Sequence, residues 1–140
     1  MTGTRHPLHP AVVHFPVACW SLATFADLAS PWLGRPAWWL AGVLLAIGTL
    51  AALAAMATGL VEFARIEADS PALRDAKRHM LLVMAAWMLY ATSLFLRVQD
   101  MALVAPGAAA LATSVAGFLC LGAAGWLGGT LVYRHHVGST

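Results

Sequence analysis

The sequence contains little charge. Only 10% of its 140 residues are Asp, Glu, Lys or Arg, whereas 61% are hydrophobic. Soluble globular domains carry about 25% charged residues, so this chain has too few charges to build a water-facing surface. The composition therefore predicts an integral membrane protein that forms one domain over residues 1–140. A formal charge of +2 and the lack of a basic stripe with interleaved aromatic residues also exclude a nucleic-acid-binding protein.

Cysteine is scarce, and the common catalytic motifs are missing. Cys19 and Cys120 each lie inside an apolar segment, which is a poor framework for a disulfide, so both are predicted to be packing thiols. The sequence has no HExxH motif, no glycine-rich phosphate loop and no Ser-His-Asp signature. These absences leave proteolysis, nucleotide chemistry and phosphoryl transfer without support.

Four long apolar segments dominate what is present. We expect helices over about 10–29, 37–63, 78–97 and 108–133, each long enough to cross a hydrocarbon core of about 30 Å. Prolines and glycines predict a turn over 30–36 and a short link before the last helix. The charged stretch 65–78 predicts a loop or a short surface helix. The predicted fold class is all-α: an integral membrane four-helix up-down bundle with both termini on the same side.

The basic residues are distributed unevenly across this topology. Two of the eight, Arg35 and Arg97, fall on the side away from the termini. The other six, on the side of the termini, are Arg5, Arg65, Arg74, Lys77, Arg78 and Arg134. Because short cytoplasmic loops carry an excess of Lys and Arg, the side of the termini is predicted to be cytoplasmic.

All six histidines fall on that same side. The first and third helices begin there and the fourth ends there, so each brings histidine to one layer, and the second helix ends there on an acidic residue. The polar groups of this layer are His6, His9, His14, Glu62, His79, His135 and His136. A polar group inside a membrane is costly unless it is used. This convergence is the strongest functional signal in the sequence, and it contrasts with Asp27, which is expected to reach the opposite face or to bond with Thr24.

Imidazole is the commonest metal ligand in proteins, and a haem b in a helix bundle needs two histidines on facing helices. We predict His14 and His79 as the axial pair, since each lies about one turn into its helix or at its mouth. His9 and His135 are candidates for a second ligand set or for hydrogen bonds to the haem propionates. The glycines predicted to leave room for a macrocycle are Gly125, Gly128 and Gly129.

Two arginines complete this hypothetical site. Arg78 and Arg134 lie next to His79 and His135 in the sequence, and a guanidinium group binds a carboxylate such as a propionate in a bidentate manner. The leading hypothesis is thus a membrane b-type haem protein that transfers electrons. One alternative is a non-haem site in which the histidines and Glu62 hold a divalent metal ion such as Zn, Cu or Fe. A second alternative is a non-catalytic module in which the same residues form a structural polar network.

Several of these residues belong to longer motifs. The segments HPAVVHFPVA, ATGLVEF and GWLGGTLVYRHHVG, together with Asp27 and His79, resemble a bacterial four-helix membrane family catalogued as domain of unknown function 2231. That family usually has Asp in place of Glu62 and Gly in place of His136, so the resemblance favours His135 over His136 as the ligand.

Some relatives in that family are fused to Rieske iron–sulfur or cytochrome domains. The resemblance therefore implies electron transfer in a membrane. The haem hypothesis adds quinone or a redox protein partner, in the lipid bilayer of a bacterial inner membrane. The glycine and alanine faces of the second and fourth helices would allow a homodimer.

Overall fold

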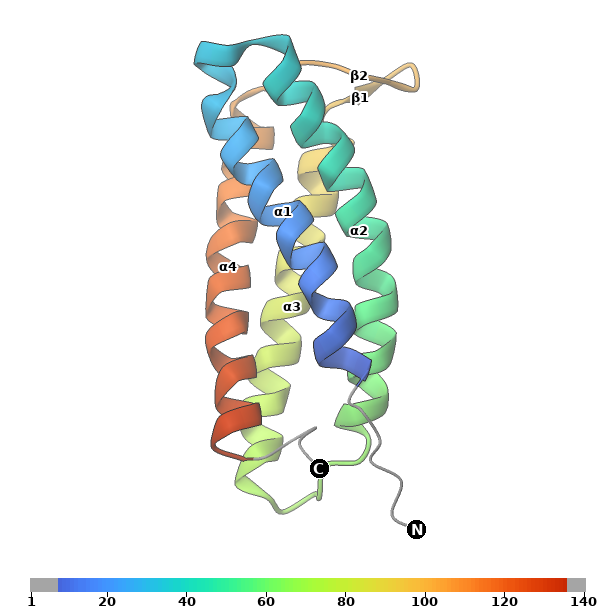
Figure 1. The fold of residues 1–140 in the computed structure, drawn as a ribbon, viewed down its shortest axis with the longest axis vertical. Coiled ribbons are helices and arrows are strands. Elements are labelled where there is room, and N and C mark those ends of the chain that lie inside the picture. Colours follow the sequence, from blue (N-terminus) through green and yellow to red (C-terminus); the bar gives the residue numbers. More distant parts are fainter. Residues whose placement is uncertain (1–7, 136–140) are drawn as a thin grey trace.

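The chain is a bundle of four long helices in up-down order (Figure 1). The structure is a computed structural model that describes residues 8–135. Helices α1 (Leu8–Leu33), α2 (Arg35–Phe63), α3 (Pro71–Phe95) and α4 (Ala108–Tyr133) are each long and apolar enough to cross a membrane. This confirms the all-α membrane bundle. Helix α1 begins and α4 ends at the same end of the bundle, which we call the histidine end.

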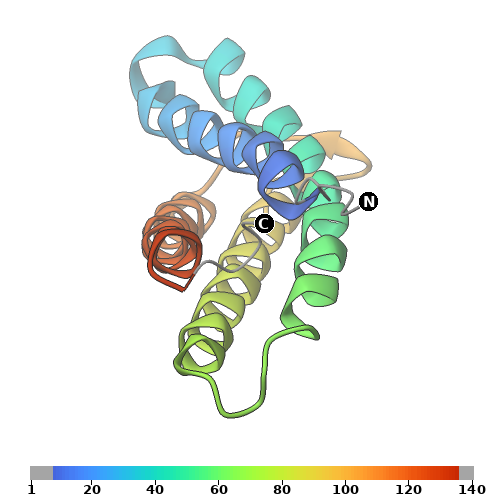
Figure 2. The same ribbon diagram turned by 60° about the horizontal axis from the view of Figure 1, so that its bottom comes forward.

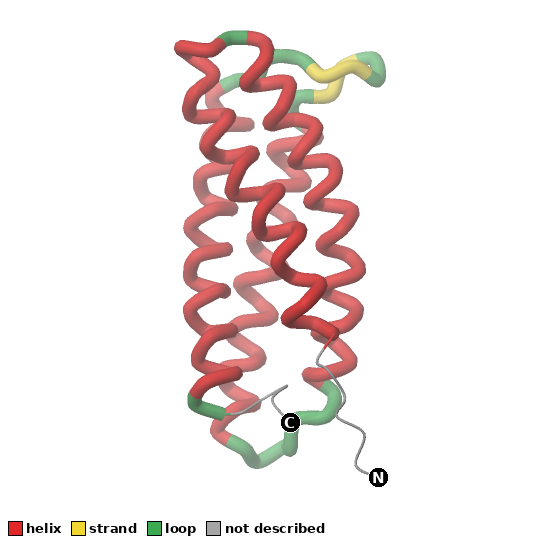
Figure 3. The backbone as a smooth tube through the Cα atoms, in the orientation of Figure 1, coloured by secondary structure: helices red, strands yellow, loops and turns green. Residues whose placement is uncertain are grey.

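The connection between α1 and α2 is shorter than the turn predicted over 30–36. Helix α1 continues through Pro31 to Leu33, and α2 starts at Arg35. Gly34 alone breaks the helix, with φ of 66°, and its N–H donates to the carbonyl of Ser30 at 2.8 Å. A left-handed conformation is open to glycine at little cost, so one residue suffices to reverse the chain. Figure 3 shows this single break between the two helices.

Helix α3 begins earlier than the predicted residue 78. Ser70 occupies the N-cap position and Pro71 the first turn, where a proline fits because its missing N–H has no helical partner. The charged residues 74–78 are therefore part of α3 and not of a separate surface helix. At the other end of α3, strands β1 (Val98–Gln99) and β2 (Ala102–Leu103) form a small antiparallel hairpin that the sequence analysis missed.

The helices pack as two pairs. Helix α1 packs mainly on α2, and α3 mainly on α4, whereas the two pairs touch one another far less. Seen from the histidine end, the connection between α2 and α3 joins one pair to the other (Figure 2). The main core lies between the pairs, from the middle of the bundle towards the end opposite the histidines. Its buried residues are Trp20, Ala23, Leu45, Ala52, Ala86, Tyr90 and Leu121.

The outer surface of the bundle is apolar. Large side chains such as Leu50, Leu119 and Trp126 are 68–80% exposed along the length of the helices. In water an apolar surface of this extent would drive aggregation, but lipid chains solvate it. The exposed faces are therefore the lipid-facing surface of a membrane protein.

Candidate functional site

The inner histidines belong to a layer of residues that are partly or fully exposed. We call His9 together with residues 11–15, 56–63, 77–85 and 125–130 the histidine layer; none of these residues is buried. On one side of the layer lies the main core, and on the other a small cluster of Ala72, Ala76 and Leu131.

His9 and His79 meet inside this layer. Their ring centroids are 6.5 Å apart and their planes are nearly perpendicular, at 85°. The Nδ1 of His9 donates to the carbonyl of Ala55 at 2.9 Å, and the Nδ1 of His79 donates to the carbonyl of Ala124 at 2.8 Å. Because a carbonyl only accepts, each ring carries its proton on Nδ1 and leaves the Nε2 lone pair free. A ring held in this way is the usual form of a metal-ligating histidine.

The distance between the two rings suits one shared ion. Metal–imidazole bonds are about 2.0–2.1 Å long, so two imidazoles on opposite sides of one ion have ring centroids about 6–6.5 Å apart. The Nδ1 proton and the Nε2 lone pair lie on roughly opposite edges of an imidazole. Nδ1 of His9 is bonded to a carbonyl of α2 and Nδ1 of His79 to a carbonyl of α4, so neither Nδ1 is available as a ligand.

Glycines make room for both rings. A Cβ atom at Gly59 would lie 2.9 Å from Cε1 of His9, and one at Gly128 would lie 3.2 Å from Cε1 of His79. With a larger residue at position 59 the His9 ring would have to shift, and with one at position 128 the His79 ring would have to move by a few tenths of an ångström. Gly128 was predicted to leave space for a macrocycle, but here it leaves space for the ligand. Gly125 and Gly129 have no neighbour against them from another helix.

His14 does not lie beside His79, contrary to the predicted axial pair. Its side chain is exposed on α1, whereas His9 occupies the inner face. The physical reason is helical phase: five residues at 3.6 per turn separate His9 and His14 by about 140° around the helix. The same geometry puts His9, Trp20 and Asp27 within about 20° of one another around the helix. This shared phase is the sequence feature that could have identified His9 as the inward-facing histidine.

The other predicted groups at the histidine end lie away from the pair. His135 is bonded through Nε2 to Asp75 at 3.1 Å, and this contact ties the end of α4 to α3. The Arg78 side chain is exposed and lies 3.9 Å from Asp75. Arg134 is exposed at the end of α4. Both arginines are thus accessible at the end of the bundle nearest the pair, while His6 and His136 lie outside the described residues.

Glu62 does not join the two histidines as a third ligand. Over residues 8–135, no three His, Cys, Asp or Glu side chains come close enough to hold a metal ion together. Glu62 is half-buried at the end of α2, and the ion pairs found within that range do not include it. The site that can be described therefore offers two imidazole ligands.

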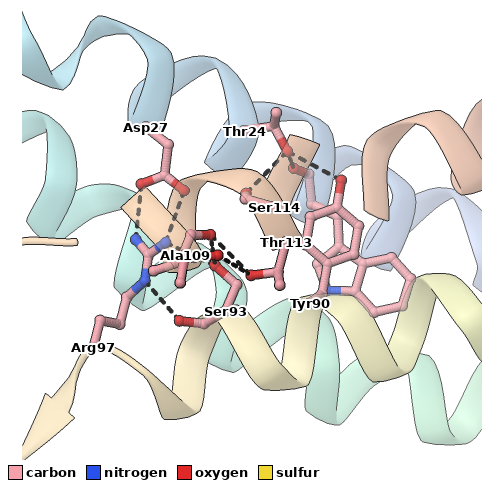
Figure 4. A network of polar contacts seen from close by, with 10 residues as sticks. Thr24, Asp27, Tyr90, Ser93, Arg97, Ala109, Thr113 and Ser114 are labelled. Atoms are coloured by element: carbon pink, nitrogen blue, oxygen red, sulfur yellow. Dashed lines mark hydrogen bonds and ion pairs between the residues drawn. The ribbon is translucent and has the colours of Figure 1, made fainter. Parts of the chain in front are cut away.

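A second polar site, which the sequence analysis did not predict, lies at the opposite end. Arg97 donates two hydrogen bonds to the carboxylate of Asp27, at 2.7 and 2.9 Å, and both side chains are fully buried. Arg97 also donates to the hydroxyl and the carbonyl of Ser93. Asp27 thus neither reaches the membrane face opposite the histidines nor bonds with Thr24, contrary to both expectations. Figure 4 shows this ion pair joining α1 to the end of α3.

A network of hydroxyl groups and aromatic rings lies between the two sites. Trp20 stacks on Tyr90, with centroids 4.8 Å apart. The hydroxyl of Tyr90 lies 3.0 Å from that of Thr24, which in turn lies 3.4 Å from that of Ser114 (Figure 4). In the part of the chain that is described, every buried side-chain polar atom has a partner. This network therefore holds the pairs together without leaving a polar group unsatisfied.

The family of the chain follows from its sequence together with this architecture. A family model described as Predicted membrane protein (DUF2231) matches residues 5–140. The chain belongs to this family. The family description agrees with the four membrane-spanning helices and names no cofactor. No curated protein and no solved structure matches the chain.

Proposed function

We propose that this member of the family is a b-type haem protein that transfers electrons, and that His9 and His79 are the axial ligands. The observation that carries the proposal is the pair itself: two imidazoles 6.5 Å apart, each with Nδ1 bonded to a backbone carbonyl. That distance is the one expected for two imidazoles on one ion. The carbonyl bonds fix the rings so that both Nε2 atoms are available as ligands.

The number of ligands supports haem over a bare metal ion. A closed zinc site takes four protein ligands, and a catalytic one takes three, whereas the described residues bring two together. A haem supplies four nitrogen ligands of its own and asks the protein for two axial ones.

In this proposal the protein holds the group and tunes it. A bound haem supplies one-electron chemistry at its iron. His9 and His79 would hold the iron, the Ala55 and Ala124 carbonyls would raise the basicity of the two imidazoles, and the surrounding apolar helices would exclude water. Arg78 and Arg134, exposed at the histidine end, suit the propionates.

The proposal extends to location and partners. The basic residues gather at the histidine end, which favours a cytoplasmic position for that end in a bacterial inner membrane. A centre near that face is within reach of a quinone in the lipid and of a redox protein partner outside it. The exposed surface of α4 around Gly125, where a Cβ would meet nothing, would let a second copy approach closely in a homodimer.

The test is whether the purified protein carries haem. The full chain is produced in cells supplied with a haem precursor, purified in detergent, and measured for visible absorption and for iron, zinc and copper. We expect a Soret band, a sharp α band after dithionite reduction and one iron per chain. A colourless protein with no iron overturns the proposal, and stoichiometric zinc or copper in its place would favour a bare metal site.

A further inference from the structure

The two helix pairs repeat one another residue by residue. On the odd-numbered helices, a shift of 70 residues carries His9 to His79, Trp20 to Tyr90, and Asp27 to Arg97. The members of each couple lie together: the imidazole centroids are 6.5 Å apart with nearly perpendicular planes, the aromatic rings stack, and the carboxylate binds the guanidinium group. Both helices therefore contribute to the same three layers with the same spacing of 11 and then 7 residues.

The even-numbered helices show the same correspondence with a shift of 69. Gly59 lies against the ring of His9 and Gly128 against the ring of His79. One level up, Gly48 lies against Trp20 and Gly117 against Tyr90. The carbonyls that accept from the two histidines, those of Ala55 and Ala124, are also 69 residues apart.

Burial follows the same shift. The inner positions of α2 at 41, 45, 48, 52 and 55 are buried, and so are the corresponding positions of α4 at 110, 114, 117, 121 and 124. Few of these residues are identical, so the repeat is hard to see in the sequence alone. The identical pairs on these two helices are Ala41/Ala110, Gly48/Gly117, Leu50/Leu119, Ala54/Ala123, Ala55/Ala124 and Gly59/Gly128.

We infer that the chain is a tandem repeat of one helical hairpin, in which His9 and His79 are equivalent ligands of a single shared centre and Gly59 and Gly128 are matched positioning residues. Helices α1 and α3 run in the same direction, so the axis that relates the hairpins lies along the bundle, as in parallel repeats of membrane proteins. The centre lies where this axis passes between the two imidazoles. The chemistry of the shared centre rests on the proposed function. The repeat itself does not depend on it.

The outermost layer shows how the two halves have diverged. Equivalent positions in two identical hairpins would carry the same charge and repel, whereas Asp27 and Arg97 carry opposite charges and form a bidentate pair. The first hairpin therefore fits the second hairpin better than it fits another copy of itself. The histidine layer, in contrast, has kept the same ligand, carbonyl and glycine in both halves.

The experiment titrates haemin into the full-length protein in detergent. The variants are His9→Ala, His79→Ala, Gly59→Ala and Gly128→Ala, with Gly122→Ala as the control because a Cβ there meets nothing. Wild type should saturate at one haem per chain. Either histidine variant should abolish the low-spin spectrum, and either ring-facing glycine variant should weaken binding about tenfold, because a methyl group overpacks the site. Gly122→Ala should bind as wild type does.

A second measurement separates positioning from folding. The haem-free Gly59→Ala and Gly128→Ala proteins should keep the helical circular dichroism of Gly122→Ala, while the low-spin spectra of both haem-loaded variants shift in the same direction. Two haems per chain, or a histidine variant that keeps the low-spin spectrum, would overturn the shared centre. Glycine variants that bind haem as tightly as the control would overturn the positioning role.

If wild type takes up no haem, the proposed function fails and the repeat is judged by nitrogen-15 NMR of the histidine rings in the ligand-free protein. If the two rings are equivalent, both should carry the proton on Nδ1, and both Nδ1–H groups should show the chemical shift of an N–H that donates to a carbonyl. Gly59→Ala should disturb the His9 signal alone, and Gly128→Ala that of His79 alone. Rings in different tautomers would overturn the equivalence of the two halves.

Discussion

The buried ion pair yields a quantitative prediction about stability. Asp27 and Arg97 are 1% and 0% exposed and are joined by two hydrogen bonds of 2.7 and 2.9 Å. Removing one partner of a buried pair leaves a charge without compensation and costs about 3–5 kcal/mol. We therefore expect Asp27→Leu and Arg97→Met each to lower the unfolding free energy by about that amount.

The double variant should recover most of this loss. Replacing both partners by apolar residues of similar size removes the attraction together with the cost of desolvating two charges, and the result is often close to neutral. In the double variant the Ser93 hydroxyl still donates to the carbonyl of Ala110 at 2.7 Å, and the one hydrogen bond lost besides the ion pair that leaves an acceptor unpaired is that from Arg97 Nε to the Ser93 carbonyl. The double variant is thus expected within about 2 kcal/mol of wild type.

The assay unfolds wild type, the two single variants and the double variant with sodium dodecyl sulfate in mixed micelles. Unfolding is followed by far-ultraviolet circular dichroism. Asp100→Asn is the control, since it removes an exposed acid at the same end of the bundle. The reasoning would be refuted by single variants that cost less than about 1 kcal/mol, or by a double variant that loses the sum of the two single losses.

Two further predictions concern the middle of the bundle. Tyr90→Phe removes the hydroxyl that lies 3.0 Å from Thr24 and should lower the unfolding free energy by about 0.5–1.5 kcal/mol; an unchanged melting temperature would mean that this hydrogen bond contributes nothing. Gly117→Ala places a Cβ 3.1 Å from two ring carbons of Tyr90, which is fully buried and cannot yield. It should cost about 1 kcal/mol in the same assay, whereas Gly122→Ala should be neutral or slightly stabilising, and equal effects would contradict the packing argument.

The four helices could be predicted from the sequence because long apolar runs leave no other structure for a chain in lipid. The residues at which the helices begin and end were less predictable, because a proline can lie either inside a terminal turn of a helix or in the connection beside it. Pro71 lies in the first turn of α3, where its missing N–H has no helical partner, whereas Pro31 lies in the last turn of α1, where it removes one helical hydrogen bond to the carbonyl of Asp27.

The layer of the candidate site could be predicted, but not which histidines face inward. Topology alone brings the ends of α1, α3 and α4 together. The inward face of α1 is not marked by its hydrophobicity, because the helix is apolar all round, as expected for a membrane span. The chosen partner for His79 was therefore His14, the histidine deeper in the membrane, whereas His9 shares the inner face with Trp20 and Asp27.

The partner of Asp27 could not be predicted because Arg97 is 70 residues away. Each charge lies near a helix end, where a solvated or interfacial position is the simpler expectation. The pairing becomes evident only when the repeat of 70 residues is recognised, because it places the two charges at equivalent positions of the two hairpins.

The most direct test of the central claim, that His9 and His79 form the ligand pair, is a comparison of the dithionite-reduced minus oxidised spectra of three single variants with wild type. His9→Ala and His79→Ala should both lose the α band, whereas His14→Ala, whose side chain is exposed on α1, should keep it. Loss of the band in His14→Ala with retention in His9→Ala would contradict the account.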